Sequence, residues 1–270
     1  MLHKETGGNP LAVLDLGFGC GDQTFELIRL TQPGSGWNNF RYVGLTLNQA
    51  QLDTASRKVA HEVSKSSSLS SDSFKLFCAD AAQPKSWNRQ AAAAVQSLAD
   101  PSITERWLLA LDCLYHFRPS RKPVFEHAAK QLGANAMAFD LILNERASRR
   151  EVWLARLICL IMRCPLEAFK TDIEYRNDLV DVGYDVDQII IHDISKHVFA
   201  PVSAFLETQE RALSLYGVSM GGYKLAGRLF SWFGRSQVVK AVIVVARVPA
   251  SSRGTGETIL GSEAETIPST

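Results

Sequence analysis

Three glycines at alternate positions follow a short apolar run near the start of the chain: Gly17, Gly19 and Gly21. The run covers residues 11–16 and is interrupted only by Asp15, so it predicts a strand buried on both faces of a sheet. Glycine allows a tight turn, and it lets a ligand approach the main chain where a Cβ would collide. Residues 22–30 have the apolar spacing of a helix packed on a sheet. A strand, a glycine turn and a helix in this order present free N–H groups to a nucleotide-like ligand.

The spacing of the glycines distinguishes between ligands. A dinucleotide-binding turn has the pattern G-x-G-x-x-G, but counted from Gly17 the third glycine position holds Asp22. The phosphate-binding pattern G-x-x-x-x-G-K-[ST] is absent from the sequence. The observed D-L-G-x-G-x-G therefore argues against NAD and gives no support for ATP.

The same pattern resembles the first motif of class I S-adenosylmethionine-dependent methyltransferases. The resemblance implies that the glycines pass the methionine part of the cofactor and that the acid near the strand end helps to hold its amino group. The first predicted cofactor-binding residues are thus Asp15, Gly17, Gly19 and Gly21. A simpler alternative stays open, in which the glycines only turn the chain.

Length and composition predict the number of domains, the kind of partner and the state of the cysteines. A chain of 270 residues can bury one large core, so we expect a single domain over residues 1–249 and a disordered tail over 250–270. The formal net charge of +1 gives no general reason to expect a nucleic-acid partner. The five cysteines form no C-x-x-C pair, and together with the absence of a signal core they predict reduced thiols in a cytoplasmic protein.

The second predicted strand, residues 40–46, ends in Thr46, and Asn48 is placed to cap the helix after it. The string VGLTLNQAQ resembles the VGITLS-x-x-Q of the tocopherol, sterol and cyclopropane-fatty-acid branch of these methyltransferases, in which Thr replaces an acid. The resemblance makes Thr46, Leu47 and Gln51 cofactor-binding candidates and favours a small, lipid-like or isoprenoid-like acceptor. Alternatively, Thr46 is an ordinary strand residue.

The third predicted strand, residues 74–79, ends in Asp80 and Ala81. These residues resemble the family's second motif, in which an acid accepts a hydrogen bond from the adenine amino group and the next N–H contacts a ring nitrogen. The alternative is an Asp that caps the next turn of the chain. Because the ends of parallel strands meet at one edge of an open sheet, we expect Asp15, Thr46 and Asp80 to lie at the same edge.

The fourth predicted strand, residues 107–111, leads into Asp112, Tyr115 and His116. The string ALDCLYHF resembles the S-M-E-x-x-E-H segment of the tocopherol and sterol branch, which makes these three residues catalytic candidates. A base is needed only if the acceptor must lose a proton. Tyr115 stands where that branch often has a second Glu, which argues against cyclopropanation. For His116, a structural histidine hydrogen-bonded under a loop is the alternative.

The rest of the chain predicts three more strands, over residues 134–143, 184–191 and 238–248. Seven strands, with helices between the first five, indicate a doubly wound α/β domain with a Rossmann-like sheet. By the resemblance, the strand order is 3-2-1-4-5-7-6 and the last strand is antiparallel. Two helical segments, 148–182 and 199–235, are expected to cover the carboxyl edge of the sheet. His192 and His197 lie five residues apart without a third ligand, so no metal site is predicted.

Two helices of the expected cover are basic and otherwise apolar. Arg149, Arg156 and Arg163 fall on one stripe of the first, since seven residues bring a helix almost back to the same angle. Lys224 and Arg228 lie four residues apart on another. Two roles stay open: a lid with its apolar sides buried, or a peripheral contact with an anionic membrane surface.

The resemblance implies methyl transfer from S-adenosylmethionine to a small, largely apolar acceptor. Most of the rate would come from holding the acceptor and the sulfonium in line in a dry site. The alternative is a binding protein that keeps the cofactor fold without catalysis. That alternative is supported by the short segment before the first strand and by the altered fourth-strand motif.

Overall fold

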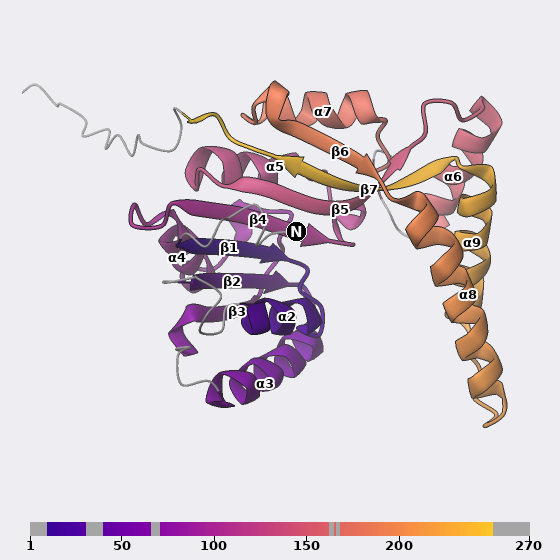
Figure 1. Cartoon of the computed structure of the whole chain (residues 1–270), viewed down its shortest axis with the longest axis horizontal. Coiled ribbons are helices and arrows are strands. Elements are labelled where there is room, and N and C mark those ends of the chain that lie inside the picture. Colours follow the sequence, from indigo (N-terminus) through magenta and orange to yellow (C-terminus); the bar gives the residue numbers. More distant parts are fainter. Residues whose placement is uncertain (1–9, 31–39, 66–70, 162–164, 166–167, 251–270) are drawn as a thin grey trace, which may run out of the picture.

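The computed structural model describes residues 10–30, 40–65, 71–161, 165 and 168–250 of the chain. Its centre is a seven-stranded sheet with the order β3-β2-β1-β4-β5-β7-β6 (Figure 1). The strands are β1 (Leu11–Leu16), β2 (Phe40–Thr46), β3 (Phe74–Cys78), β4 (Glu105–Leu111), β5 (Asn135–Leu143), β6 (Ile189–Asp193) and β7 (Val239–Ala246). β7 runs antiparallel to both of its neighbours, and all other neighbouring pairs are parallel. The predicted doubly wound sheet, its strand order and its antiparallel last strand are confirmed.

Helices cover both faces of this sheet. The described α-helices are α2 (Asp22–Leu30), α3 (Gln49–Lys65), α4 (Arg89–Gln96), α5 (Lys122–Glu126), α6 (Arg149–Ile161), α7 (Asp172–Asp181), α8 (Ser195–Ser214) and α9 (Gly222–Ser236). α4, α5 and α7 pack on one face, and α2 and α3 pack on the other. Because strand side chains alternate between the faces, Leu14 of β1 packs in the apolar layer under α4, α5 and α7, and Val13 packs in the layer under α2 and α3.

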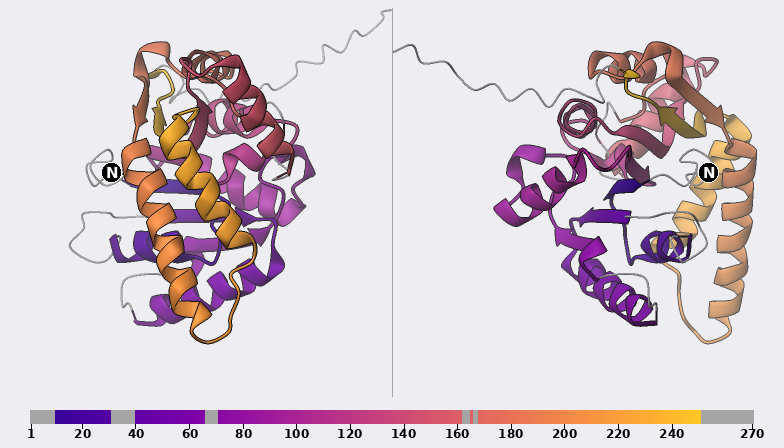
Figure 2. Two further views of the ribbon diagram at one scale, coloured as in Figure 1. Left: turned by 90° about the vertical axis from the view of Figure 1, so that its right-hand side faces the viewer. Right: turned by 60° about the vertical axis from the view of Figure 1, so that its left-hand side comes forward.

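α8 and α9 form a helical hairpin between β6 and β7, and the hairpin stands beside the edge at which β1, β2 and β4 end (Figure 1). Figure 2 shows the same pair in front of the strand ends when that edge faces the viewer. Phe199 of α8 and Phe233 of α9 pack with Leu141 of β5 and Ala155 of α6 in a third apolar cluster. The hairpin is therefore anchored on the β5–β7 half of the sheet and extends along its carboxyl edge.

α7 packs on the sheet, although the sequence predicts a cover over residues 148–182. Tyr175 and Leu179 are buried in the same layer as Phe125 of α5, with 6.4 Å between the ring centroids of Phe125 and Tyr175. Thr171 begins this helix through a capping box with Glu174. Among the described helices, α6, α8 and α9 remain available to cover an acceptor, and that role stays a prediction.

β6 begins at Ile189, later in the chain than the predicted start at residue 184. Asp185 accepts a hydrogen bond from the N–H of Asp187 at 3.0 Å and so begins a 3-10 helix over Val186–Gln188. An acid that caps a turn interrupts the extended chain, and the strand can start only after it. The apolar run at residues 189–191 is the part of the prediction that the structure confirms.

Two features of the described part of the chain bear on membrane contact. None of its helices is long and apolar enough to span a bilayer. Arg149 and Arg156 of the predicted arginine stripe are exposed on α6, whereas Arg163 lies outside the described residues. Residues 251–270 of the predicted tail also lie outside them.

Candidate functional site

The glycine turn after β1 fits closely against its neighbours at two of its three glycines. All three have positive φ, 68° at Gly17, 60° at Gly19 and 83° at Gly21, which side chains rarely tolerate. A Cβ at Gly17 would lie 2.8 Å from the Cβ of Cys113, and a Cβ at Gly21 would lie 2.8 Å from the Cβ of Ala55. A Cβ at Gly19 would meet no heavy atom of the described residues within 4 Å. Gly17 and Gly21 thus serve packing, and Gly19 borders open space that a ligand can enter.

The main chain of the turn offers hydrogen-bond donors. The N–H of Gly21 donates to the carbonyl of Phe18 at 3.1 Å, which closes the turn. Within the described residues, the N–H groups of Gly19 and Cys20 make no main-chain hydrogen bond. α2 begins at Asp22, so its first-turn N–H groups lie directly after the turn. This is the arrangement in which a helix N-terminus favours a polar or anionic group of a ligand.

Asp15 lies fully buried behind the turn. Its Oδ2 accepts hydrogen bonds from the Tyr42 hydroxyl at 2.6 Å and from Nε2 of Gln23 at 3.1 Å. Within the described residues, its Oδ1 has no hydrogen-bond partner. Burial raises the pKa of Asp15 to about 7, and the hydrogen bond from Tyr42 opposes that rise. A buried carboxylate oxygen without a partner fits a cationic donor, such as the amino group that the motif resemblance assigns to this residue.

At the end of β2, polar side chains connect the strand to α3. The Thr46 hydroxyl donates to Oε1 of Gln51 at 2.9 Å. Oδ1 of Asn48 accepts from the N–H of Ala50 at 2.9 Å, so Asn48 caps α3 as predicted. Leu47 lies between them with 73% of its surface exposed. The structure thus brings Thr46 and Gln51 together, and it leaves an apolar side chain open at the sheet edge.

At the end of β3, Asp80 caps a turn. Its Oδ1 accepts from the N–H of Ala82 at 2.9 Å, and its Oδ2 accepts from Nε2 of Gln83 at 2.9 Å. The main-chain carbonyl of Asp80 accepts from Nε1 of Trp87 at 2.8 Å, and Ala81 is buried. Each carboxylate oxygen has a second lone pair, so turn capping does not prevent a further bond to a ligand. Adenine binding by Asp80 and Ala81 stays a prediction.

At the end of β4, the three predicted catalytic residues form one cluster. Asp112 has a φ of 61°, a left-handed conformation that is uncommon outside glycine and that concentrates at functional sites. The Tyr115 hydroxyl donates to Oδ1 of Asp112 at 2.7 Å. The rings of Tyr115 and His116 lie 4.4 Å apart between centroids. The turn therefore places a carboxylate, a phenol and an imidazole together.

Burial shifts the pKa values of two groups in this cluster. It lowers the pKa of His116, and the nearby charge of Asp112 opposes that shift. It raises the pKa of Asp112, although this side chain reaches solvent, and the Tyr115 hydrogen bond acts in the other direction. A histidine with a lowered pKa is neutral near neutral pH and can accept a proton.

Cys113 connects the β4 turn to the glycine turn. Its Cβ is the atom that leaves no room for a side chain at Gly17, and its thiol donates to the carbonyl of Leu16 at 3.2 Å. β1 and β4 are also neighbours in the sheet. The predicted cofactor residues at β1 and the predicted catalytic residues at β4 therefore lie side by side. The sequence predicts a shared edge, but it does not identify Cys113 as the contact.

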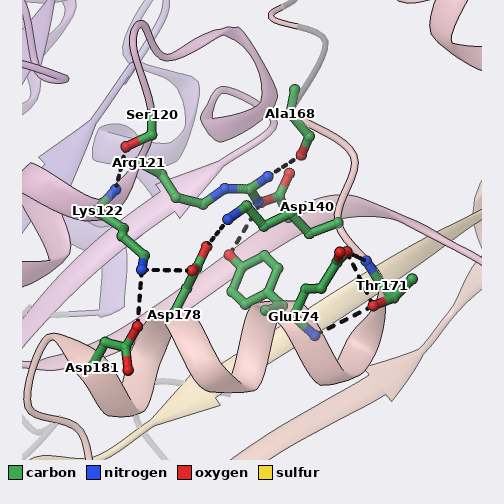
Figure 3. Close-up of polar contacts among 11 residues, drawn as sticks. Ser120, Arg121, Lys122, Asp140, Ala168, Thr171, Glu174, Asp178 and Asp181 are labelled. Carbon is green, nitrogen blue, oxygen red and sulfur yellow. Dashed lines mark hydrogen bonds and ion pairs between the residues drawn. The ribbon is translucent and has the colours of Figure 1, made fainter.

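A buried ionic network that the sequence motifs did not reveal fixes the chain after the β4 turn (Figure 3). Arg121 donates to the carboxylate of Asp140 in β5 and to the carbonyl of Ala168. The Tyr175 hydroxyl of α7 donates to the same Asp140 carboxylate at 3.1 Å, and the Arg121 guanidinium lies 4.6 Å from the centre of the Tyr175 ring. Arg121 comes five residues after His116, so this network limits how far the β4 turn can move. A sequence signal existed, because Asp140 interrupts an otherwise apolar strand.

A cleft of about 1050 Å³ lies beside α8 and α9, between the end of β5 and the start of β7. Its lining contains charged side chains of both signs, four of them basic (Arg146, Lys196, Arg235 and Lys240) and three acidic (Glu145, Asp193 and Glu207). This charged lining differs from the third apolar cluster, against which Tyr115 packs. Among the described residues, no group of three or more His, Cys, Asp or Glu side chains could hold a metal ion.

No family model matches the sequence, and no curated protein matches it significantly. Solved structures do resemble the chain. The geranyl diphosphate C-methyltransferase of Streptomyces coelicolor, solved with Mg²⁺, geranyl diphosphate and S-adenosyl-L-homocysteine, has a TM-score of 0.57 and 15% identity, covering 92% of this chain and 76% of that one. A cyclopropane synthase of Mycobacterium tuberculosis has a TM-score of 0.61 and 12% identity, covering 91% and 82%. The [4+2]-cyclase SpnF has a TM-score of 0.57 and 16% identity, covering 92% and 80%.

The chain therefore has the Rossmann-like fold of the S-adenosylmethionine-dependent methyltransferases that act on small molecules. At these identities the likeness shows the fold. A structure named as a cyclase is among the similar ones, so the reaction has to be argued from the site.

Proposed function

We propose that the chain binds S-adenosylmethionine at the carboxyl ends of β1 to β4 and transfers its methyl group to a small, largely apolar acceptor. The observation that carries this proposal is the contact between Gly17 and Cys113, because it joins two sets of residues. One set is the glycine turn, which is open at Gly19. The other is the turn with Asp112, Tyr115 and His116, at the end of the neighbouring strand.

The residues at this edge fit the proposed cofactor. The unpartnered Oδ1 of Asp15 would accept from the amino group, and the N–H groups at Gly19 and Cys20 would contact the methionine part. Leu47 offers an apolar surface to the adenine ring, and Asp80 keeps a lone pair for its amino group. Thr46 and Gln51 would hold the ribose hydroxyls from the end of β2.

When bound, this cofactor supplies an electrophilic methyl group. The chain's own residues would hold the acceptor in line and exclude water, which accounts for most of the rate in a direct displacement. His116 would take a proton from an acceptor that must lose one, since its lowered pKa keeps Nε2 or Nδ1 available near neutral pH. Asp112 and Tyr115 would orient that imidazole and the acceptor through their 2.7 Å hydrogen bond.

Two observations support an apolar acceptor. Tyr115 packs against the third apolar cluster, which contains side chains of β5 and β7 as well as of α6, α8 and α9, so one of the catalytic candidates borders an apolar region. The strand end with Thr46 resembles the branch with lipid-like and isoprenoid-like substrates. An apolar acceptor partitions into lipid, so peripheral contact with an anionic membrane is part of the same proposal.

A second candidate function is cofactor binding without methyl transfer. The similar cyclase, whose name describes a different reaction, gives this candidate a specific basis. Binding alone does not separate the two candidates, because both require the glycine turn. Turnover separates them.

The experiment is an acceptor screen with methyl-labelled S-adenosylmethionine. Purified protein is incubated with lipid extract and with panels of isoprenoids, phenols and amines, and labelled products are identified by mass spectrometry. A labelled apolar product that disappears with His116→Ala supports the proposal. Tight cofactor binding without a labelled product in any panel would establish the second candidate instead.

A further inference from the structure

The tip of the α8–α9 hairpin exposes an unusual number of large apolar side chains. We call residues 211–228 the hairpin tip. Five of its side chains are more than half exposed: Leu215, Tyr216, Val218, Tyr223 and Leu225. Leu215 and Tyr216 are 84% and 83% exposed, the highest values among the exposed large apolar side chains of the described residues. A cluster of this kind within eleven residues marks an interaction surface, whereas single exposed apolar residues are ordinary.

The charges of the hairpin tip have one sign. Arg211, Lys224 and Arg228 are its only charged residues, and no carboxylate side chain occurs in its sequence. Lys224 pairs with Glu210, just before the tip, at 2.6 Å. Exposed tyrosines and leucines combined with basic residues are the composition of segments that lie in the interface of an anionic bilayer.

We propose that the hairpin tip inserts shallowly into an anionic lipid surface. Leu215, Tyr216 and Val218 would enter the boundary between head groups and acyl chains, and Arg211 and Arg228 would contact the phosphates. Tyrosine suits this depth because its ring is apolar and its hydroxyl stays wet. The tip needs no transmembrane helix for this contact.

The place of the tip in the fold favours lipid over burial within the same chain. Figure 1 shows the hairpin projecting past the sheet, with its tip at the end distant from the anchoring strands. The anchoring contacts involve the opposite end of the hairpin, where Phe199 and Phe233 join the third cluster. A second copy of the chain would cover the apolar side chains as well, but it would bring two sets of like charges together.

This inference rests on the proposed function only for the reason that membrane contact would be useful to the protein. The hairpin stands beside the carboxyl edge, so a tip resting on lipid would hold that edge next to a membrane-dissolved apolar acceptor (Figure 2). The physical contact itself depends on the exposed side chains and the charges. It can therefore be tested without any acceptor.

The test is flotation of the full-length protein with two kinds of vesicle, phosphatidylcholine alone and phosphatidylcholine mixed with phosphatidylserine. Wild type should float with the anionic vesicles at low salt, and less so at high salt. The double variant Leu215→Ser with Tyr216→Ser should lower the partition coefficient at least about tenfold. Arg211→Gln with Arg228→Gln should lower it about fivefold per charge removed.

The control carries Ile173→Ser and Val186→Ser, two substitutions at apolar residues outside the tip that are also more than half exposed. It should float like wild type, and calorimetry should give the same S-adenosylmethionine affinity for every variant. The inference would be overturned if wild type did not float, or if the Leu215→Ser, Tyr216→Ser variant floated as well as wild type. The cofactor affinity tests the proposed function separately. Light scattering that shows a dimer of wild type and a monomer of the tip variant would assign the tip to a second copy, which would also overturn it.

Discussion

At the scale of single residues, the site is built from side chains whose neighbours are distant in sequence. Asp15 was identifiable from the sequence because it is the one polar residue of an apolar strand that leads into a glycine turn. Its partners Tyr42 and Gln23 were not, since a strand tyrosine and a helix glutamine have no distinguishing pattern. Asp80 was identifiable as well, but the choice between turn capping and ligand binding depends on contacts such as the 2.9 Å bond from Ala82.

The first prediction concerns the stability cost of Asp15. Its pKa rises from 3.8 to about 7 on folding, so the folded protein binds the proton more tightly and stability is lost as pH rises through that range. Asp15→Asn removes the ionisation. As pH rises from about 5 to about 8, the free energy of unfolding of wild type should fall by roughly 2 to 3 kcal/mol more than that of the variant. Urea denaturation at the two pH values measures this, and parallel pH dependence of the two proteins would contradict a raised pKa for the buried Asp15.

The second prediction concerns His116 as a base. Because burial lowers its pKa below the ordinary 6.5, turnover should stay constant from high pH down to neutral pH and should fall only below about 6.5. His116→Ala should reduce turnover about 10² to 10⁴ fold, the usual size of a general-base contribution, with S-adenosylmethionine affinity unchanged. Steady-state kinetics over pH, with calorimetry of the cofactor, make the measurement. A variant as active as wild type with the same pH profile would leave His116 with a structural role.

At the scale of elements, the first five strands were easier to predict from the sequence than the elements after them. Each of the first four strands ends in a recognisable motif and the fifth is a long apolar run, whereas β6 is preceded by a capped 3-10 turn that resembles an extended chain in hydropathy. α7 was expected in the cover because its position in the chain lies beyond β5. Its place on the sheet depends on the buried contacts of Tyr175 and on the Arg121–Asp140 pair, which only the folded chain brings together.

The third prediction tests how α7 is held. Asp140→Asn leaves the Arg121 charge buried without its partner, so it should lower the free energy of unfolding by about 3 to 5 kcal/mol. Thr171→Ala removes only the capping box of α7 and should cost about 1 kcal/mol. Urea denaturation gives both values. Equal costs for the two variants would contradict the assignment of the network as the main anchor.

At the scale of the whole molecule, the fold was predictable because the same unit, a parallel strand followed by a helix, recurs along the first half of the chain. Each parallel strand delivers its motif to the same edge, so the order of the motifs in the chain implies the topology of the sheet. The place of the α8–α9 hairpin beside the carboxyl edge was an expectation from the family resemblance, since hydropathy shows that its helices are amphipathic but not which edge they run along. Its tip contains Lys224 and Arg228, from which the sequence in part predicts membrane contact, whereas the exposure of Leu215 and Tyr216 was not identified from the sequence.

The central claim is that the carboxyl edge binds S-adenosylmethionine, and calorimetric titration with the cofactor tests it most directly. Wild type should bind one equivalent. Gly19→Val fills the open space beside the turn with a branched side chain, so it should abolish cofactor binding. A φ of 60° strains the valine by about 1 to 3 kcal/mol, which should leave the fold intact as measured by circular dichroism. Gly222→Ala, at a glycine that also borders open space but lies in α9, is the matched control and should bind like wild type. No binding to wild type, or wild-type affinity in Gly19→Val, would contradict the account.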